Sequence, residues 1–466
     1  MKALTDVKPT PEQLALLSRI RPGVQVIRGA AGSGKTTTAL LKLRSAVGTY
    51  ISRAKRNGTG PVRVLVLTFN RTLRGYISEL AEHQLDESEY LSLEILTFSK
   101  WAQNLATDRT LINPTDPFLS NLLQEIRMPK DFLREEVHYV LGRFLPDELG
   151  NYVSARRDGR GTVPRMEHSH RTELLEKVIW PYIEYKKEKG VSDWGDYAAD
   201  LALNSYEKYD VVVVDEAQDF SANEIRAVMK QLSSDHTVTF VLDSAQRIYA
   251  RNFSWAEVGI SIRPENSHLL SENYRNTREI AEFAAGIMEG MALDSDGSMP
   301  SFDSAEKRGD IPVVIEGRFP AQMDYVINYI KENINLKRES VAFLHAKGGG
   351  WFNTLREKLR SENIDFVDIS ARPDWPQGTQ NVALSTIHSA KGLEFDHVFM
   401  IGLDGELLPV DDDEDSAEGE ALPRYRRLIA MGIGRARKSV IIGFLKTDKP
   451  VVDQFFSAGK YRRVDV

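Results

Sequence analysis

Short apolar runs alternate along the chain with longer amphipathic stretches, and turn residues separate them. The apolar runs form an early and a late set: residues 24–29, 62–69, 210–216 and 237–243, then 341–345, 381–388, 397–403 and 439–444. Most of them lack strict alternation, which suits strands buried on both faces of a parallel sheet. The two sets therefore predict an α/β fold with two lobes, each a parallel sheet covered by helices.

The pattern changes in one region between these sets. Residues 104–205 have helical periodicity, as in HRTELLEKVIWPYIEYKKEKG, and no comparable strand run. We interpret this region as a mainly helical insertion in the first lobe. The predicted organisation is residues 1–103 and 206–268 for the first lobe, 104–205 for the insertion and 269–466 for the second lobe.

Composition and charge limit the class of protein. The chain has 466 residues, 27% charged, with a net charge of −7, which argues against a protein that coats nucleic acid by bulk charge. It contains no cysteine, which excludes disulfides, thiolate metal sites and a cysteine nucleophile. No apolar run approaches the roughly 20 residues of a membrane span, and the N-terminus lacks the apolar stretch of a signal peptide. We therefore expect a cytoplasmic protein that does not bind membranes.

A glycine-rich segment follows the first predicted strand. GAAGSGKT at residues 29–36 matches the phosphate-loop pattern, and a helical stretch follows it. In such a loop the backbone N–H groups and the helix N-terminus bind phosphate oxygens. Lys35 is expected to bridge the β- and γ-phosphates of ATP, and Thr36 to bind Mg²⁺. The residues expected to line this site are Gly29, Ala30, Ala31, Gly32, Ser33, Gly34, Lys35, Thr36 and Thr37.

Two carboxylates follow the four valines of VVVVDEAQD (211–219). The end of this strand should bring Asp215 to the metal ion that Thr36 holds, as phosphoryl transfer requires. Glu216 should then orient or deprotonate the attacking water. Lys35, Asp215 and Glu216 are therefore candidate catalytic residues.

Together, DEAQD and GAAGSGKT resemble the superfamily 1 helicases of the UvrD/Rep/PcrA group. Seven further segments resemble the group's motifs in the expected order: TPEQ (10–13), TFNRTL (68–73), TFSKW (97–101), LDSAQRIY (242–249), ENYRNT (272–277), STIHSAKGLEF (385–395) and RRLIAMGIGRAR (426–437). The resemblance covers nearly the whole chain. It implies that the two lobes are tandem RecA-like P-loop NTPase domains.

The resemblance also implies residue roles around ATP. Gln13 would recognise adenine, Tyr274 would stack on it, and Glu394 would lie near the ribose.

Three further residues are implied to act at the γ-phosphate: Gln246 as a sensor, with Arg275 and Arg435 as arginine fingers. Both arginines belong to the second lobe, so the site would be complete only when the lobes close. The sequence departs from the group at Gly434, where relatives usually have threonine.

A single strand of DNA is the track that the resemblance implies, with movement from 3′ to 5′. Aromatic side chains would stack on its bases, with core packing as the alternative for each. Arg156 could contact a phosphate, with solvated surface charge as the alternative. The candidate nucleic-acid contacts are Phe69, Asn70, Arg71, Trp101, Tyr249, Trp255 and His388.

Larger relatives carry a second helical insertion between two of these motifs. Here Arg275 and Lys391 lie only 116 positions apart, so this insertion is expected to be reduced or absent. The leading hypothesis is an ATP-dependent helicase or translocase on single-stranded or tailed duplex DNA, which unwinds weakly without a partner. The alternatives are an RNA-acting helicase and an ATP-driven switch that signals to a partner effector such as a nuclease.

Overall fold

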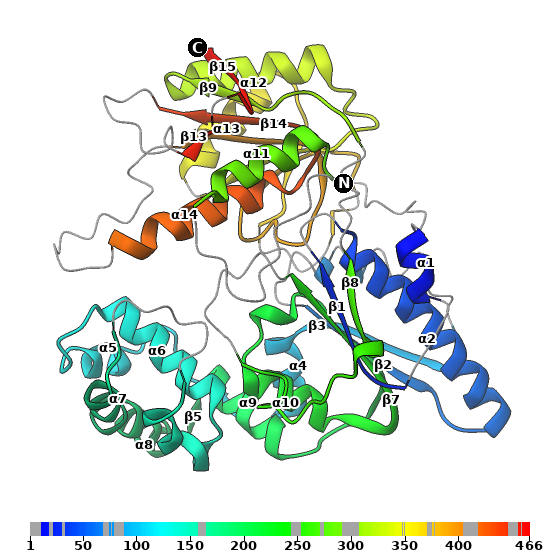
Figure 1. The fold of residues 1–466 in the computed structure, drawn as a ribbon, viewed down its shortest axis with the longest axis vertical. Coiled ribbons are helices and arrows are strands. Elements are labelled where there is room, and N and C mark those ends of the chain that lie inside the picture. The colour runs from blue at the N-terminus through cyan, green and yellow to red at the C-terminus, as the bar shows by residue number, and fades with distance from the viewer. Residues whose placement is uncertain are drawn as a thin grey trace.

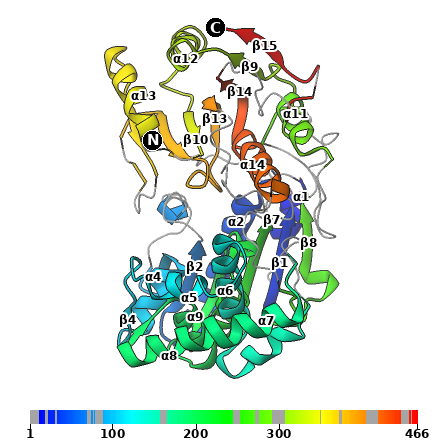
Figure 2. The same ribbon diagram turned by 90° about the vertical axis from the view of Figure 1, so that its left-hand side faces the viewer.

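The computed structural model describes most of the chain: residues 11–17, 22–29, 33–68, 74–75, 77–78, 88–156, 165–243, 253–270, 275–290, 307–346, 348, 350–370, 375–376, 378–403, 418–445, 455–457 and 459–466. Two large sheets divide it into a lower and an upper half, and the third sheet described has only two strands (Figure 1, Figure 2). All strand pairs described are parallel. The predicted α/β fold with two parallel sheets is confirmed.

The first sheet has six strands, in the order β3 (Leu91–Thr97), β2 (Val62–Thr68), β6 (Tyr209–Val214), β7 (Leu232–Asp243), β1 (Gly23–Gly29) and β8 (Ser267–Leu270). Four longer helices pack on it: α2 (Lys35–Asn57) on one face, and α4 (Phe98–Leu105), α9 (Trp194–Leu203) and α10 (Ala222–Lys230) on the other. A short helix, α1 (Pro11–Leu17), lies beside α2.

Strand β6 explains why the valine run does not alternate with polar residues. Val211 and Val213 join the core under α2, whereas Val212 and Val214 join the core on the opposite face. Because successive side chains of a strand point to opposite faces, every position of a doubly covered strand is apolar. The run therefore places the two carboxylates that follow it at the carboxyl edge of a central strand.

The second sheet has seven strands, in the order β11 (Phe366–Asp368), β12 (Val382–Thr386), β10 (Val341–His345), β13 (Phe395–Leu403), β14 (Ala436–Phe444), β9 (Val313–Glu316) and β15 (Arg462–Asp465). Helices α12 (Phe319–Asn333) and α13 (Gly350–Ser361) cover one face, and α11 (Arg278–Met288) and α14 (Glu418–Ile433) cover the other. Within the described residues between Arg275 and Lys391, the helices thus belong to this layered lobe.

A helical region extends beside the first sheet (Figure 1). Its elements are β4 (Thr110–Leu111), α5 (Phe118–Leu123), α6 (Lys130–Arg143), a 3₁₀ helix η1 (Pro146–Val153), α7 (His168–Leu174), a π-helix η2 (Leu175–Ile179), α8 (Trp180–Lys189) and β5 (Val191–Ser192). Helices α5 to α8 share a core of their own, whereas α9 packs into the core of the first lobe. The boundaries given above for the domains stay a prediction.

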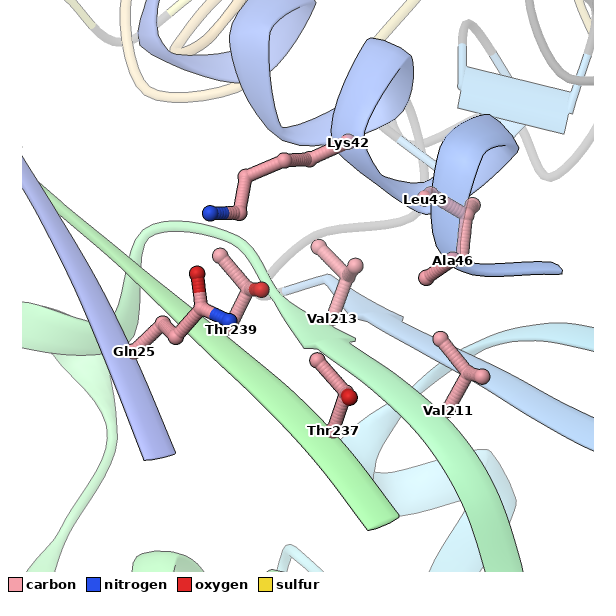
Figure 3. A pocket seen from close by; sticks show the side chains of 8 residues that line it. All are labelled: Gln25, Lys42, Leu43, Ala46, Val211, Val213, Thr237 and Thr239. Carbon is pink, nitrogen blue, oxygen red and sulfur yellow. The ribbon is translucent and has the colours of Figure 1, made fainter. Parts of the chain in front are cut away.

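Buried polar side chains lie between α2 and the first sheet (Figure 3). Lys42 of α2 is 5% exposed and extends over the sheet toward Gln25 of β1 and Thr239 of β7. The space they line holds only about 10 Å³. A buried ammonium group is tolerated only among polar groups, and Gln25 and Thr239 provide such groups on the sheet opposite Lys42 (Figure 3).

No helix in the described part of the chain combines the length and the apolar character needed to cross a bilayer.

Candidate nucleotide site and nucleic-acid contacts

The phosphate loop runs from the end of β1 into the first turn of α2. Lys35 is buried, and its Nζ donates a hydrogen bond to the carbonyl oxygen of Gly29 at 2.9 Å. The Thr38 hydroxyl donates to the carbonyl of Gly34 at 2.8 Å in the same turn. The lysine thus points back across the loop. Ala30, Ala31 and Gly32 lie outside the described residues.

Two glycines of the loop are required by their surroundings. Gly34 has a φ of 74°, and a Cβ there would lie 2.5 Å from the side-chain nitrogen of Gln13. At Gly29 a Cβ would lie 2.8 Å from the carbonyl oxygen of Leu270 on β8. Glycine avoids the collision at both positions and also the left-handed strain at Gly34, so these two glycines of the motif have a steric cause.

Gln13 lies on α1 and reaches the phosphate loop. Its Nε2 is 3.4 Å from the carbonyl oxygen of Gly34, and its side chain is 2% exposed. The glutamine is therefore held beside the loop, at the place where a nucleotide would approach. Its contact with adenine stays a prediction, and Tyr274, the other adenine candidate, lies outside the described residues.

Thr36 and Asp215 meet at the edge of the first sheet where strands β1 and β6 end. The Thr36 hydroxyl donates to Oδ2 of Asp215 at 2.9 Å, although 179 positions separate them. Burial and the neighbouring Glu216 carboxylate raise the pKa of Asp215 to about 7. A hydroxyl and a carboxylate side by side are ligands that Mg²⁺ prefers, and its charge would stabilise the ionised carboxylate. These two residues therefore fit a magnesium ion.

Glu216 has a backbone conformation that is rare for its residue type. Its φ of 53° lies in the left-handed region, which costs about 1–3 kcal/mol for a residue other than glycine. The side chain is 6% exposed, and Nε2 of Gln218 donates a hydrogen bond to its Oε2. The strained backbone and the glutamine together direct this carboxylate.

A cation of the second lobe contacts the Glu216 carboxylate. Nζ of Lys391 lies 3.4 Å from Oε2 of Glu216 and also forms an ion pair with Oδ2 of Asp219. Burial alone would raise the pKa of Glu216. The charges of Lys391, Arg435 and Lys35, together with the hydrogen bond from Gln218, outweigh this effect and lower the pKa below its usual value.

Lys391 and Asp219 were not among the candidates from the sequence. Each lies in a segment that was identified, SAKGLEF for the lysine and DEAQD for the aspartate. The sequence did contain a signal for this ion pair, because one motif carries a lysine and the other an aspartate. Since the two lobes were expected to meet at these motifs, Lys391 could have been paired with Asp219.

Arg275 and Glu394 form an ion pair within the second lobe. Nη2 of Arg275 lies 2.5 Å from Oε1 of Glu394, and Nη1 lies 3.4 Å from the carbonyl oxygen of Gly434. Burial acts to raise the pKa of Glu394, but the charge of Arg275 lowers it. The structure thus brings together two residues that the sequence linked to the γ-phosphate and the ribose. Both roles stay predictions.

Arg435 follows Gly434, just beyond the end of α14. It is 3% exposed, and its Nε donates to the carbonyl oxygen of Met431 at 3.2 Å. Asn276 donates to the carbonyl oxygens of Gly434 and Ala436, at 3.3 and 2.5 Å. Hydrogen bonds from side chains of one segment to backbone carbonyls of the other therefore connect the two segments that carry the predicted arginine fingers.

The prediction that Trp101 stacks on bases is corrected by the structure. Trp101 is 0% exposed, and its indole nitrogen donates to the hydroxyl of Tyr209 at 3.2 Å. Its ring also packs edge-on against Phe98, with centroids 5.5 Å apart. A side chain enclosed in this way in the core under α4 presents no face to a nucleic acid.

Trp255 and His388 are both partly exposed. The Trp255 ring packs against Phe240 of β7 and Phe253, at centroid distances of 5.1 and 5.8 Å. Their contacts with nucleic acid stay predictions. The other candidates lie outside the described residues: Phe69, Asn70, Arg71, Gln246 and Tyr249.

Two family models match the chain. Residues 12–252 match the AAA domain, and residues 369–447 match the UvrD-like helicase C-terminal domain. The first match covers more than half of the chain and contains the phosphate loop and both carboxylates. The second contains Lys391, Glu394 and Arg435.

Several curated proteins are similar in sequence. A probable DNA helicase II homolog of Mycoplasma pneumoniae is 24% identical over 358 residues, covering 69% of this chain and 49% of the homolog. A probable DNA helicase of the same organism is 21% identical over 448 residues, covering 90% and 80%. The ATP-dependent DNA helicase Rep of Escherichia coli is 36% identical over 79 residues, covering 17% and 11%.

A solved structure is also similar, that of the C-terminal domain of a possible DNA helicase from Lactobacillus plantarum. It is 18% identical, with a TM-score of 0.29, and the match covers 41% of this chain and 98% of that one.

This chain spans about half the length of the first of these relatives. The AAA domain comes first in the sequence and the UvrD-like helicase C-terminal domain second, as do the two sheets. The chain therefore belongs to the UvrD/Rep family of DNA helicases.

Proposed function

We propose that this protein is an ATP-dependent DNA helicase or translocase that moves from 3′ to 5′ along single-stranded DNA. The proposal rests on the observation that residues of both lobes lie around Glu216. The first lobe supplies the carboxylate beside Thr36 and Asp215, and the second lobe supplies Lys391 and Arg435. A site shared in this way would couple ATP turnover to the separation of the lobes.

The described residues fit ATP and Mg²⁺ as cofactors. Lys35 would exchange its contact with the Gly29 carbonyl for the β- and γ-phosphates, a charge-assisted interaction. Thr36 and Asp215 would hold the metal ion, and Glu216 would orient the attacking water. Bound ATP would also place its γ-phosphate between the lobes, where it could pair with the cations of the second lobe.

Movement along the strand would follow from lobe closure. Arg275 and Arg435 would complete the site around the γ-phosphate, as arginine fingers do. Hydrolysis followed by release of inorganic phosphate would remove the γ-phosphate charge and let the lobes part. Each cycle would then shift one lobe along the strand relative to the other.

An ATPase assay with single-stranded DNA, single-stranded RNA and blunt duplex tests this proposal. Single-stranded DNA should stimulate turnover most, and the Glu216→Gln variant should remain inactive with every nucleic acid. Turnover that is indifferent to all three would contradict a motor on nucleic acid. Preferential stimulation by RNA would favour an RNA-acting helicase instead.

Duplexes with a 3′ or a 5′ tail test polarity and unwinding. A 3′-tailed duplex should be opened in preference to a 5′-tailed one. We expect a compact motor in which the monomer unwinds long duplexes weakly without a partner. Efficient unwinding of a long duplex by the monomer would contradict this part of the proposal.

A second candidate is an ATP-driven switch that signals to a nuclease or another effector in the cytoplasm. It is favoured by a relative from Lactococcus lactis whose name joins the two activities, the exonuclease/helicase subunit RexA. That protein is 26% identical over 237 residues, covering 44% of this chain and 20% of the relative. Stimulation by single-stranded DNA without strand displacement would favour the switch.

A further inference from the structure

The C-terminal end of α6 packs against the helix that follows the catalytic carboxylates. A Cβ on Gly142 would lie 2.9 Å from Cβ of Ser221, the residue that caps α10. Asn223 in the first turn of α10 donates to the carbonyl oxygens of Leu141 and Phe144, at 3.0 and 2.9 Å. The insertion therefore contacts the first lobe through these hydrogen bonds, shortly after Glu216 in the sequence.

Arg143 is the last residue of α6, and its side chain is 8% exposed. Its Nε and Nη2 donate to the two carboxylate oxygens of Glu257, at 2.6 and 3.0 Å. Its guanidinium lies over the rings of Tyr139 and Phe144, 5.4 and 5.6 Å from their centroids. A bidentate pair of this kind is strong and fixes the relative orientation of its partners.

Arg143 also contacts the segment that follows η1. Its Nη1 donates to the carbonyl oxygen of Arg156 at 2.9 Å. Arg156 is the arginine for which the sequence suggests a phosphate contact. The guanidinium of Arg143 thus joins Arg156 to Glu257 through separate nitrogen atoms.

Glu257 belongs to the turn that carries Trp255. This tryptophan is partly exposed and is a predicted contact with the nucleic-acid strand. The amide of Ile260 donates to the carbonyl oxygen of Trp255 at 2.8 Å, which closes the turn. The Trp255 ring packs on Phe240 of β7, the strand between β1 and β6. Glu257 therefore connects Arg143 to a predicted strand contact.

Arg226 of α10 completes the connection. Its Nη1 donates to the carbonyl oxygen of Arg143 at 2.7 Å, and its Nη2 to the carbonyl oxygen of Glu257 at 3.1 Å. The helix after the catalytic carboxylates, the insertion and the Trp255 turn therefore meet at one ion pair. We name this cluster the α6 junction: Leu141, Arg143, Phe144, Asn223, Arg226 and Glu257.

We propose that Arg143 is a positioning residue that couples binding of the nucleic-acid strand to ATP turnover at Glu216. This inference rests on the proposed function, because it needs a strand that the Trp255 turn contacts. The hydrogen bonds of Arg143 within the described residues lead to Glu257, Tyr139 and Arg156, so we infer that it acts through the α6 junction. Displacement of the Trp255 turn by a strand would move Glu257, and the bidentate pair would pass this movement to α6 and α10.

Arg171 offers a matched control. It is another arginine of the insertion, and it donates to four carbonyl oxygens there, those of Met166, Tyr152, Val153 and Ala155. These contacts hold the insertion together and do not include the α6 junction. A purely structural role for Arg143 predicts that loss of either arginine has the same kind of effect.

The test compares Arg143→Met, Arg143→Lys, Glu257→Gln and Arg171→Met with the unaltered protein. ATP turnover is measured without nucleic acid and across a titration of oligo(dT), which separates maximal stimulation from half-saturation. Urea unfolding checks that each variant is folded. Arg143→Lys and Glu257→Gln serve as milder changes in case Arg143→Met does not fold.

Arg143→Met should reduce maximal stimulation by roughly 5- to 150-fold, the usual range of coupling between two sites. Turnover without nucleic acid should stay unchanged, as should the oligo(dT) concentration for half-saturation. Arg143→Lys and Glu257→Gln should lose less, and Arg171→Met should be stimulated normally.

Full stimulation of folded Arg143 variants would overturn the inference and leave the proposed function intact. Equal losses in Arg143→Met and Arg171→Met would also overturn it, since they indicate general loosening of the insertion. If oligo(dT) does not stimulate the unaltered protein, the proposed function fails first and the inference with it.

Discussion

Lys35 illustrates how a single residue of the loop is held ready for its ligand. Its ammonium is buried and hydrogen-bonded to a backbone carbonyl, which is a weaker partner than phosphate. The Lys35→Ala variant should weaken ATP binding by roughly 10- to 100-fold, because a hydrogen bond to a charged group is worth about 1.5–3 kcal/mol. Titration with a fluorescent ATP analogue measures this change. Lys55→Ala, at the exposed end of the same helix, should bind normally, and equal weakening in both variants would contradict the assignment.

Glu216 should be needed for turnover and not for binding. The Glu216→Gln variant retains the shape of the side chain but cannot accept a proton from water. Turnover should fall about 10²- to 10⁴-fold, the range attributed to a general base, while ATP affinity stays within a few-fold. Single-turnover hydrolysis and equilibrium binding separate the two effects. A parallel loss of affinity and turnover would mean that Glu216 serves mainly to bind the nucleotide.

For individual residues, the sequence predicted which side chains belong to the site better than it predicted the contacts between them. The glycines, Lys35, Thr36 and the two carboxylates follow from a loop and a strand that are each continuous in sequence. The Thr36–Asp215 hydrogen bond confirms the expected meeting of the two motifs. Lys391 was missed because its partners, Asp219 and Glu216, lie in the other lobe.

Among the secondary-structure elements, the strands with apolar side chains on both faces were predicted well. The valines of β6 enter two different cores, so no polar position interrupts the run. Trp101 was harder, because α4 is only eight residues long. Burial of that tryptophan depends on Tyr209 and Phe98, and Tyr209 is 108 positions away.

Two tryptophans should respond differently to truncation. Trp101→Ala removes a fully buried ring and should lower the free energy of unfolding by about 3–5 kcal/mol. Trp255 is partly exposed, so Trp255→Ala should cost less stability but weaken oligo(dT) binding by about 1–3 kcal/mol for one stacked base. Urea titration and fluorescence anisotropy measure the two quantities. Normal oligo(dT) binding by Trp255→Ala would remove this residue from the strand contacts.

The two lobes meet at a buried charge cluster, which makes their contact sensitive to single substitutions. Lys391→Met would remove the cation that forms ion pairs with the buried Asp219 and Glu216, at a cost of about 3–5 kcal/mol. The first unfolding transition in urea should shift accordingly. The double variant Lys391→Met with Asp219→Leu should recover part of the loss, because it removes a charge from each lobe. No recovery would argue that the lysine stabilises the protein through other contacts.

Whole-molecule organisation followed from the two sets of apolar runs, since the four runs of each set lie in one sheet. The remaining strands, β3 and β8 of the first sheet and β9, β11 and β15 of the second, were not among these runs. The relation between the lobes could not be predicted in the same way. It depends on a few side chains, such as Lys391, whose partners lie 172 and 175 positions away in the sequence. The spacing of apolar residues predicts the sheets and helices within a lobe. Contacts such as those of Lys391 depend on how the two folded lobes pack against each other.

The double coverage of β6 has a consequence for inhibition. A strand packed into cores on both faces offers Glu216 little freedom to move, and its backbone is already strained. In the proposed mechanism, lobe closure would therefore bring cations to a stationary carboxylate. A small molecule wedged between the lobes near Lys391 would block that delivery while leaving the phosphate loop accessible. Such a compound would lower the maximal rate without competing with ATP.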